Sequence, residues 1–221
     1  MYVKLEDFWK EIEIQAGDIV FVSSDITKIG IDAKRHGENI EIHKWIDALI
    51  RAVGKTGTII FPTYNWDFCK GIPFDYYKTP GVTGALGKYA LMRTDFRRTR
   101  HPIYSFAVYG KYRDFLCEMN NKAGFGQDSP FGFFREKNVK NYFIDVSLKN
   151  SFSYAHYVER CSGKVDYRIE KVFCAEYIDE NKEVSQREYS SFMRNWDFKP
   201  NEILLDPMEE DLISAGVEKN I

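Results

Sequence analysis

The chain has 221 residues, of which 44% are hydrophobic and 16% aromatic, enough apolar surface for one packed domain with at most an appendage. Its formal net charge of −2 and pI near 6.1 provide no basic field of the kind that binds nucleic acid. No apolar run approaches the roughly 18 residues of a membrane span, and the charged N-terminus does not resemble a signal peptide, so neither a span nor secretion is expected.

The four cysteines indicate a reducing compartment. Cys69, Cys117, Cys161 and Cys174 are widely spaced and form no C-x-x-C pair. Four reduced thiols are the simplest interpretation, because disulfides are rare in the cytoplasm. We therefore expect a cytoplasmic protein.

The first quarter of the chain alternates helical and strand-like patterns. The mixed amphipathic segment 5–14 predicts a helix, and the apolar run 19–22 predicts a strand buried on both faces. In segment 39–53, apolar residues recur at i, i+4, i+7, i+8 and i+11, which predicts an amphipathic helix. Residues 58–61 predict the next strand. The order strand, helix, strand favours an α/β fold with a right-handed crossover.

The middle of the chain continues this alternation, and its end changes character. The pattern predicts a helix opening at 83–89, a strand at 105–109, a helix at 111–119, a helix starting near Pro130 and a strand at 142–146. Two β-like runs at 167–178 and 183–194, joined by a polar turn, predict a hairpin, and a short helix at 207–217 closes the chain. We expect a single domain over 1–221, with about 165–195 as a β-hairpin appendage.

Small hydroxyl side chains stand at the ends of the predicted strands. Ser23 and Ser24 follow the first strand, Thr63 follows the second, and Ser105 stands at an end of the third. Ligands of open α/β sheets bind outside the carboxyl ends of the strands, so these hydroxyls are candidate ligand groups. An ordinary strand-end turn or helix cap is the alternative for the serine pair.

His156 and Glu159 follow the predicted strand at 142–146 and lie three residues apart. On a helix this spacing puts both side chains on one face. The carboxylate can then orient the imidazole, the side chain whose ordinary pKa lies between pH 5 and 8. The alternative is a weak ion pair on a helix surface.

Further candidates follow the second strand and the arginine-rich segment. Tyr64, Trp66 and Asp67 can hold a cationic substrate by aromatic faces and charge, although a turn aspartate is the alternative. His101 directly follows Arg100 and can donate to a ligand beside guanidinium groups that match phosphate oxygens. A loop histidine packed by the following proline is the alternative interpretation.

Several common chemistries have no motif in this sequence. It contains no phosphate-binding loop, no G-x-G-x-x-G after a strand and no G-x-S-x-G nucleophile elbow. His156, Glu159, His101, Asp67 and a cysteine do not follow any recognised zinc-ligand spacing. We therefore expect no metal site.

Six short motifs in order resemble the aminoglycoside 3-N-acetyltransferase family. They span 18–24, 57–64, 83–86, 100–105, 128–130 and 156–159. Each motif alone is weakly specific, whereas six in the family's order are specific, and the resemblance runs from about position 17 to 178. It implies a three-layer α/β/α sandwich with a small β-rich C-terminal part. It also implies transfer of acetyl from acetyl-coenzyme A to an amino group of an aminoglycoside or amino sugar.

The resemblance also assigns roles to the candidate residues. A carboxylate-supported imidazole, His156 with Glu159, removes a proton from the acceptor ammonium, while Asp67 binds the amine or supports the histidine. Ser23, Ser24, Thr63 and Ser105 are expected to hold the pantetheine and donate to the thioester oxyanion. His101 and Arg100 are expected at the cofactor's phosphates, and Tyr64, Trp66 and Asp67 at the acceptor.

Two departures leave the acceptor open. The chain is shorter than expected of drug-modifying members, and no acidic trough for a polycationic drug is evident. A nucleotide-linked amino sugar of surface polysaccharide (lipopolysaccharide) biosynthesis is therefore an alternative to an antibiotic. A hydrolase or metal-dependent enzyme and a non-catalytic sugar- or nucleotide-binding module are the remaining alternatives. The expected partners are a small amine acceptor and, as one option, a second copy of the chain in a homodimer.

Overall fold

The computed structural model describes residues 2–198 and 206–216, and its centre is a five-stranded sheet in the order β4-β5-β2-β1-β6. The strands are β1 (Ile19–Ser24), β2 (Thr58–Pro62), β4 (Arg97–Arg98), β5 (Phe106–Gly110) and β6 (Lys140–Ile144). β1 pairs in parallel with β2 and β6, whereas β5 is antiparallel to both β2 and β4. The sheet is therefore mixed: β2, β1 and β6 run parallel, and the predicted crossover joins β1 to β2.

Side chains alternate between two separate cores along each central strand. On β1, Val20 and Val22 belong to one buried cluster and Phe21 to the other. On β2, Phe61 and Ile60 divide in the same way. Successive strand residues point to opposite faces, so a continuous apolar run means that helices cover both faces of the sheet.

The first face is covered by α1 (Phe8–Glu11), α3 (Ile42–Val53) and α4 (Ala85–Ala90). Trp45 and Leu49 of α3 pack with Trp9 of α1 in one buried cluster. α3 begins three residues later than predicted. The predicted helix 5–14 shrinks to α1, since Glu13 has a φ of 62°, which a right-handed helix cannot contain. α2 (Thr27–Arg35) follows β1 and was not predicted.

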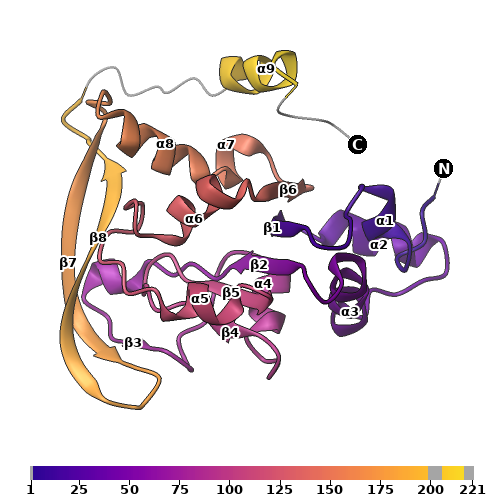
Figure 1. The fold of residues 1–221 in the computed structure, drawn as a ribbon, viewed down its shortest axis with the longest axis horizontal. Coiled ribbons are helices and arrows are strands. Elements are labelled where there is room, and N and C mark those ends of the chain that lie inside the picture. Colours follow the sequence, from indigo (N-terminus) through magenta and orange to yellow (C-terminus); the bar gives the residue numbers. More distant parts are fainter. Residues whose placement is uncertain (1, 199–205, 217–221) are drawn as a thin grey trace.

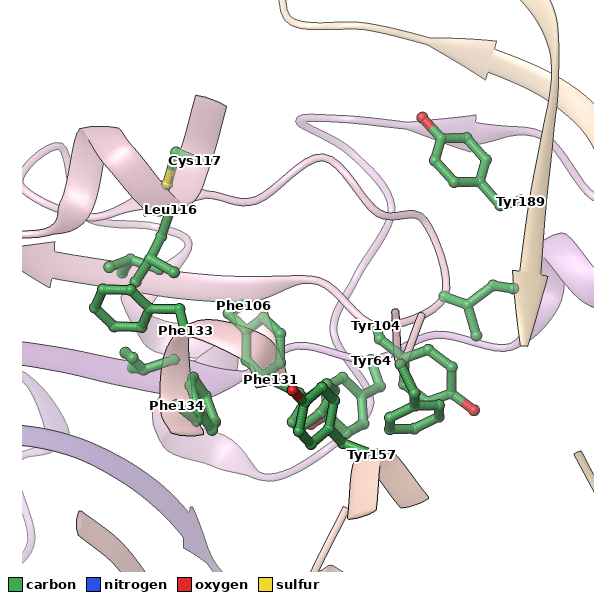
Figure 2. Close-up of a cluster of buried hydrophobic side chains, with 14 of the residues drawn as sticks. Tyr64, Tyr104, Phe106, Leu116, Cys117, Phe131, Phe133, Phe134, Tyr157 and Tyr189 are labelled. Carbon is green, nitrogen blue, oxygen red and sulfur yellow. The ribbon is translucent and has the colours of Figure 1, made fainter. Parts of the chain in front are cut away.

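The second face is covered by α5 (Arg113–Glu118), α6 (Pro130–Lys137) and α8 (Tyr154–Ser162), with α7 (Leu148–Ser151) leading into α8. Figure 2 shows Phe131 of α6 and Tyr157 of α8 beside Phe106 of the sheet. The ring centroids of Phe106 and Phe131 are 5.5 Å apart in an edge-to-face contact. α6 starts at Pro130 as predicted, because proline is tolerated in the first turn.

A second sheet forms the β-rich part predicted near the C-terminus. β7 (Arg168–Ile178) and β8 (Val184–Arg194) form a long curved hairpin along one side of the molecule (Figure 1), and β3 (Phe74–Asp75) pairs in parallel with β7. Tyr177 and Tyr189 of the hairpin are buried in the same cluster as Phe106. The three-layer α/β/α sandwich with a β-rich C-terminal part is thus confirmed.

The remaining elements are short. The 3₁₀ helix η1 (Asp67–Lys70) follows β2, and α9 (Asp206–Ser214) ends the described chain. The last part of the predicted helix 207–217 lies outside the described residues. None of the helices in the described part of the chain is long and apolar enough to cross a membrane.

Candidate active site

The ends of β1 and β2 and the start of β5 meet at one edge of the central sheet. Because β5 runs antiparallel to β2, Pro62 pairs with Phe106, and the chain brings Thr63 beside Ser105. The hydroxyl oxygens Thr63 Oγ1 and Ser105 Oγ are 2.9 Å apart, and Ser105 Oγ also lies 2.9 Å from the Thr63 carbonyl oxygen. The structure therefore brings these two predicted residues together, and both are fully buried.

Arg98 on β4 is buried at this edge of the sheet and donates hydrogen bonds to it. Its Nε donates to Ser105 Oγ over 3.0 Å, and its terminal nitrogens donate to the carbonyls of Thr63 and Thr79. Burial lowers the pKa of Arg98 to about 10. Its sequence neighbour Arg97 is partly exposed and pairs with acidic side chains, so nothing in the local sequence singles out Arg98. The hydroxyls of Thr63 and Ser105 are engaged by protein groups.

The loop before α4 rests directly on the strand ends. Gly84 has a φ of 89° and a ψ of 161°, and a Cβ there would lie 2.8 Å from the carbonyl oxygen of Ser24. Thr83 Oγ1 accepts a hydrogen bond from the Tyr64 amide over 3.1 Å. Ser23 is 6% exposed, whereas Ser24 keeps part of its surface open. The glycine is needed because this region of backbone space is almost closed to residues with a Cβ.

His156 and Glu159 form a hydrogen-bonded pair on α8. His156 Nδ1 lies 2.9 Å from Glu159 Oε2, and the two side chains are 31% and 16% exposed. An ionised carboxylate can only accept, so Nδ1 carries a proton, and in the neutral ring the lone pair is on Nε2. The helix predicted from their three-residue spacing is present, and this geometry can orient an imidazole to accept a proton at Nε2.

Two residues at the start of the hairpin complete the surroundings of Glu159. Tyr167 Oη donates to Glu159 Oε1 over 2.8 Å, and Arg168 Nε forms an ion pair with Glu159 Oε2 at 2.8 Å. Burial raises the pKa of Glu159, but the hydrogen bonds from His156 and Tyr167 and the charge of Arg168 together lower it below the ordinary value. Sequence reasoning missed both residues, because only the folding of the hairpin onto α8 makes them neighbours.

Aromatic contacts connect His156 to the predicted acceptor residues. The ring of Phe125 meets His156 edge-on at a centroid distance of 5.4 Å, and Tyr104 lies 4.6 Å from Phe125. Tyr64 follows at 5.2 Å from Tyr104 (Figure 2), and Trp66 at 6.3 Å from Tyr64. Tyr64 is buried, whereas Trp66 is 41% exposed. An accessible aromatic surface therefore lies at the end of a continuous series of rings that starts at His156.

Asp67 lies outside these contacts. It begins η1, where its carboxylate forms an ion pair with Lys70 at 2.9 Å and is 45% exposed. The carboxylate that supports His156 is Glu159. A role for Asp67 toward an acceptor stays a prediction.

His101 and Arg100 are occupied by contacts within the protein. His101 is 2% exposed, its Nδ1 accepts from the amides of Ile103 and Tyr104, and burial lowers its pKa to about 3. Arg100 forms an ion pair with Glu180 of the hairpin turn. His101 thus bonds within the loop at 100–104, and Arg100 links that loop to the hairpin; their predicted part in cofactor binding stays a prediction.

A metal site would need several ligand side chains gathered in one place. Among the residues that the structure describes, no group of three or more His, Cys, Asp or Glu side chains is arranged to hold a metal ion.

Comparison with known proteins decides the family. The family model described as aminoglycoside 3-N-acetyltransferase matches residues 21–217, which include both α8 and the sheet edge. This chain belongs to the aminoglycoside 3-N-acetyltransferase family. The family predicted from the six motifs is thereby confirmed.

One curated relative of this chain comes from Bacillus subtilis (strain 168). It is the SPbeta prophage-derived aminoglycoside N(3')-acetyltransferase-like protein YokD, 26% identical over 173 residues. The match covers 67% of this chain and 61% of that protein. The chain thus spans about three fifths of this relative's length.

Solved structures of the family share the fold. The crystal structure of YokD from Bacillus subtilis has a TM-score of 0.70 at 21% identity, covering 86% of this chain and 81% of that one. Aminoglycoside acetyltransferase AAC(3)-Xa gives 0.77 at 15% identity, with 96% and 81% covered. AAC-IIIb in a binary complex with CoASH gives 0.77 at 16% identity, with 96% and 84% covered. At these identities the likeness establishes the architecture alone.

Proposed function

We propose that this chain is an acetyl-CoA-dependent N-acetyltransferase that transfers acetyl to an amino group of an aminoglycoside, with His156 as general base. The observation that carries the proposal is the 2.9 Å hydrogen bond between His156 Nδ1 and Glu159, in a member of the aminoglycoside 3-N-acetyltransferase family. Sisomicin and apramycin, the compounds bound in solved structures of AAC-VIa and AAC(3)-IVa, are aminoglycosides and support this substrate class.

The base acts by making the acceptor nucleophilic. An amine is mostly ammonium near neutral pH and must lose a proton before its nitrogen lone pair can attack a carbonyl. His156 Nε2 takes that proton, and Glu159 stabilises the imidazolium that forms, because its carboxylate is kept ionised. A positioned general base of this kind contributes about 10²–10⁴ in rate.

Some of the residues predicted to bind coenzyme A have surface open to a ligand, and others do not. Coenzyme A, when bound, supplies the acetyl group as an activated thioester. Of the hydroxyls predicted to meet it, Ser24 keeps open surface, whereas Thr63 and Ser105 are fully buried and bonded to each other. We assign Ser24 to ligand contact. Thr63 and Ser105 instead shape the edge through Arg98.

The test is thiol release from acetyl-CoA with a panel of aminoglycosides and nucleotide-linked amino sugars. We expect release with at least one aminoglycoside. His156→Ala should lower turnover by about 10²–10⁴ while acetyl-CoA still binds by calorimetry. His43→Ala, at an exposed position on α3, is the matched control and should keep wild-type turnover. Wild-type turnover in His156→Ala would refute the base, and release with amino sugars alone would replace the proposed acceptor.

A further inference from the structure

We infer that Arg168 is a positioning residue for the base: it holds His156 with its lone pair on Nε2 and leaves that nitrogen when the acceptor amine arrives. The inference rests on the proposed function of His156. It concerns a residue of the hairpin, which joins α8 only through the tertiary fold.

The guanidinium of Arg168 is held on three sides. Nη1 donates to the Phe192 carbonyl of β8 over 3.3 Å, and Nε lies 2.8 Å from Glu159 Oε2. Nη2 lies 3.4 Å from His156 Nε2. The side chain is 16% exposed, as is that of Glu159. One cation therefore contacts both the supporting carboxylate and the nitrogen that would take the proton.

This contact selects one form of the imidazole. Guanidinium stays protonated and can only donate, so its contact with Nε2 is favourable when that nitrogen is an acceptor. Glu159 selects the same form from the other side of the ring, because it accepts from Nδ1. The two partners together leave the lone pair on Nε2, which is the form that a general base requires.

The contact is also weak enough to be exchanged. A separation of 3.4 Å is longer than the usual 2.7–3.2 Å range of N–H hydrogen bonds. An acceptor ammonium carries the same charge as Arg168 and donates in the same way. It can therefore take the place of Nη2 at Nε2, while Nε and Nη1 keep their contacts to Glu159 and Phe192.

Charges around the ring set the expected pH effect. The charged groups in contact with His156 are Glu159 from α8 and Arg168 from β7, and the neutral edge of Phe125 covers another side. The Tyr167 hydroxyl donates to Glu159 and not to the ring. Removing the Arg168 cation leaves the carboxylate alone beside the ring, which favours protonation of both ring nitrogens.

The direct test is ¹⁵N NMR of the histidine rings in the full chain at pH 7, where four histidines must be assigned. We expect an unprotonated Nε2 in the wild-type His156. Arg168→Gln should shift that signal toward the protonated form, and Arg168→Lys should restore it in part because it returns a cation. Arg160→Ala is the matched control, since Arg160 also ties α8 to β7, through Glu170 at 2.8 Å, but does not touch the ring. A wild-type signal in Arg168→Gln would overturn the inference.

Kinetics provide the second measurement. Arg168→Gln should lower kcat by about 10–100-fold, the size of loss known for outer-shell partners that orient metal-bound histidines. It should not raise the acceptor KM, because Arg168 competes with the amine, and the acidic limb of the pH–rate profile should move to higher pH. A higher KM with unchanged kcat and pH profile would contradict the inference. The NMR experiment tests the role of Arg168 without using activity. If His156→Ala retained activity, the proposed function would fail, whereas the NMR result would still decide whether Arg168 sets the form of the ring.

Discussion

His101 and His156 show at the residue scale how surroundings decide what an imidazole does. His101 is buried, and its Nδ1 accepts from two backbone amides of its own loop. His156 keeps 31% of its side chain exposed and is supported by a carboxylate. Because protonating His101 would place a charge in the core and remove an acceptor, we interpret it as a residue that stabilises the loop.

The burial of His101 predicts a pH dependence of stability. Its pKa falls to about 3 in the folded state, against about 6.5 for an ordinary histidine. The unfolded chain therefore binds one more proton between these values, and stability is full above pH 6.5 and lost as the pH falls toward 3. The expected slope is about 1.4 kcal/mol per pH unit.

Denaturant unfolding between pH 4 and 7 measures this slope. His101→Gln should flatten it, because the variant carries no titratable ring in the core. His43→Gln removes an exposed imidazole and should leave the wild-type slope. Equal slopes in wild type and His101→Gln would show that the buried ring does not govern the acid sensitivity.

At the scale of elements, the loop before α4 and the hairpin fix the edge of the sheet. Gly84 allows the loop to touch the Ser24 carbonyl. The hairpin is tied to the arginine-rich segment by the hydrogen bond from Tyr177 Oη to the Arg100 carbonyl, at 2.7 Å. These contacts join segments that are far apart in the sequence. They fix the positions of Ser24 and Arg100, two residues predicted to bind the cofactor.

Gly84→Ala tests the close approach of α4 to β1. The added Cβ would lie 2.8 Å from the Ser24 carbonyl oxygen, and the backbone at φ 89° is almost restricted to glycine. Gly54→Ala is the matched control, since Gly54 (φ 64°, ψ −171°) has a similar backbone but its added Cβ would lie no closer than 3.5 Å to Ala16, an ordinary contact. We expect Gly54→Ala to cost about 1–3 kcal/mol of the free energy of unfolding.

Gly84→Ala should cost at least about 1 kcal/mol more, because the backbone oxygen cannot move aside without shifting β1. Urea unfolding of the two variants gives the difference. Equal destabilisation would mean that backbone conformation alone accounts for the glycine and that the α4 contact adds nothing.

At the scale of the whole molecule, the hairpin shares the core of the sandwich. Tyr177, Tyr189 and Phe192 belong to the same buried cluster as Phe21 of the central sheet. Shared burial couples the two sheets, so we predict that the hairpin and the sandwich unfold together. The single domain with a hairpin appendage, expected from the sequence, becomes in this prediction one cooperative unit.

Calorimetry of Tyr177→Ala tests that coupling. Tyr177 is fully buried, so its truncation should cost about 3–5 kcal/mol and lower a single transition, with equal calorimetric and van't Hoff enthalpies. Val172→Ala, on the same strand but 63% exposed, should stay within about 0.5 kcal/mol of wild type. A separate early transition in Tyr177→Ala would show that the hairpin unfolds independently.

The sequence by itself determined β1, β2, α3, α5 and α6, the hairpin, the family and the pairing of His156 with Glu159. Those features depend on residues close in the chain: apolar periodicity, Pro130 at a helix start and a three-residue spacing on α8. The predicted strand 142–146 ran past the end of β6 at Ile144, and the predicted helix 5–14 ran past the end of α1. In both cases a left-handed backbone, at Asp145 and at Glu13, ends the element without a pattern in the sequence.

Only the tertiary structure decided which polar groups face a ligand. Thr63 and Ser105 stand 42 residues apart and meet because β5 runs antiparallel to β2, and Arg98 donates to the Ser105 hydroxyl and to the Thr63 carbonyl. Arg168 reaches His156 because the hairpin folds back on α8. Pairing between distant segments depends on the packing of whole layers, so no local spacing records it.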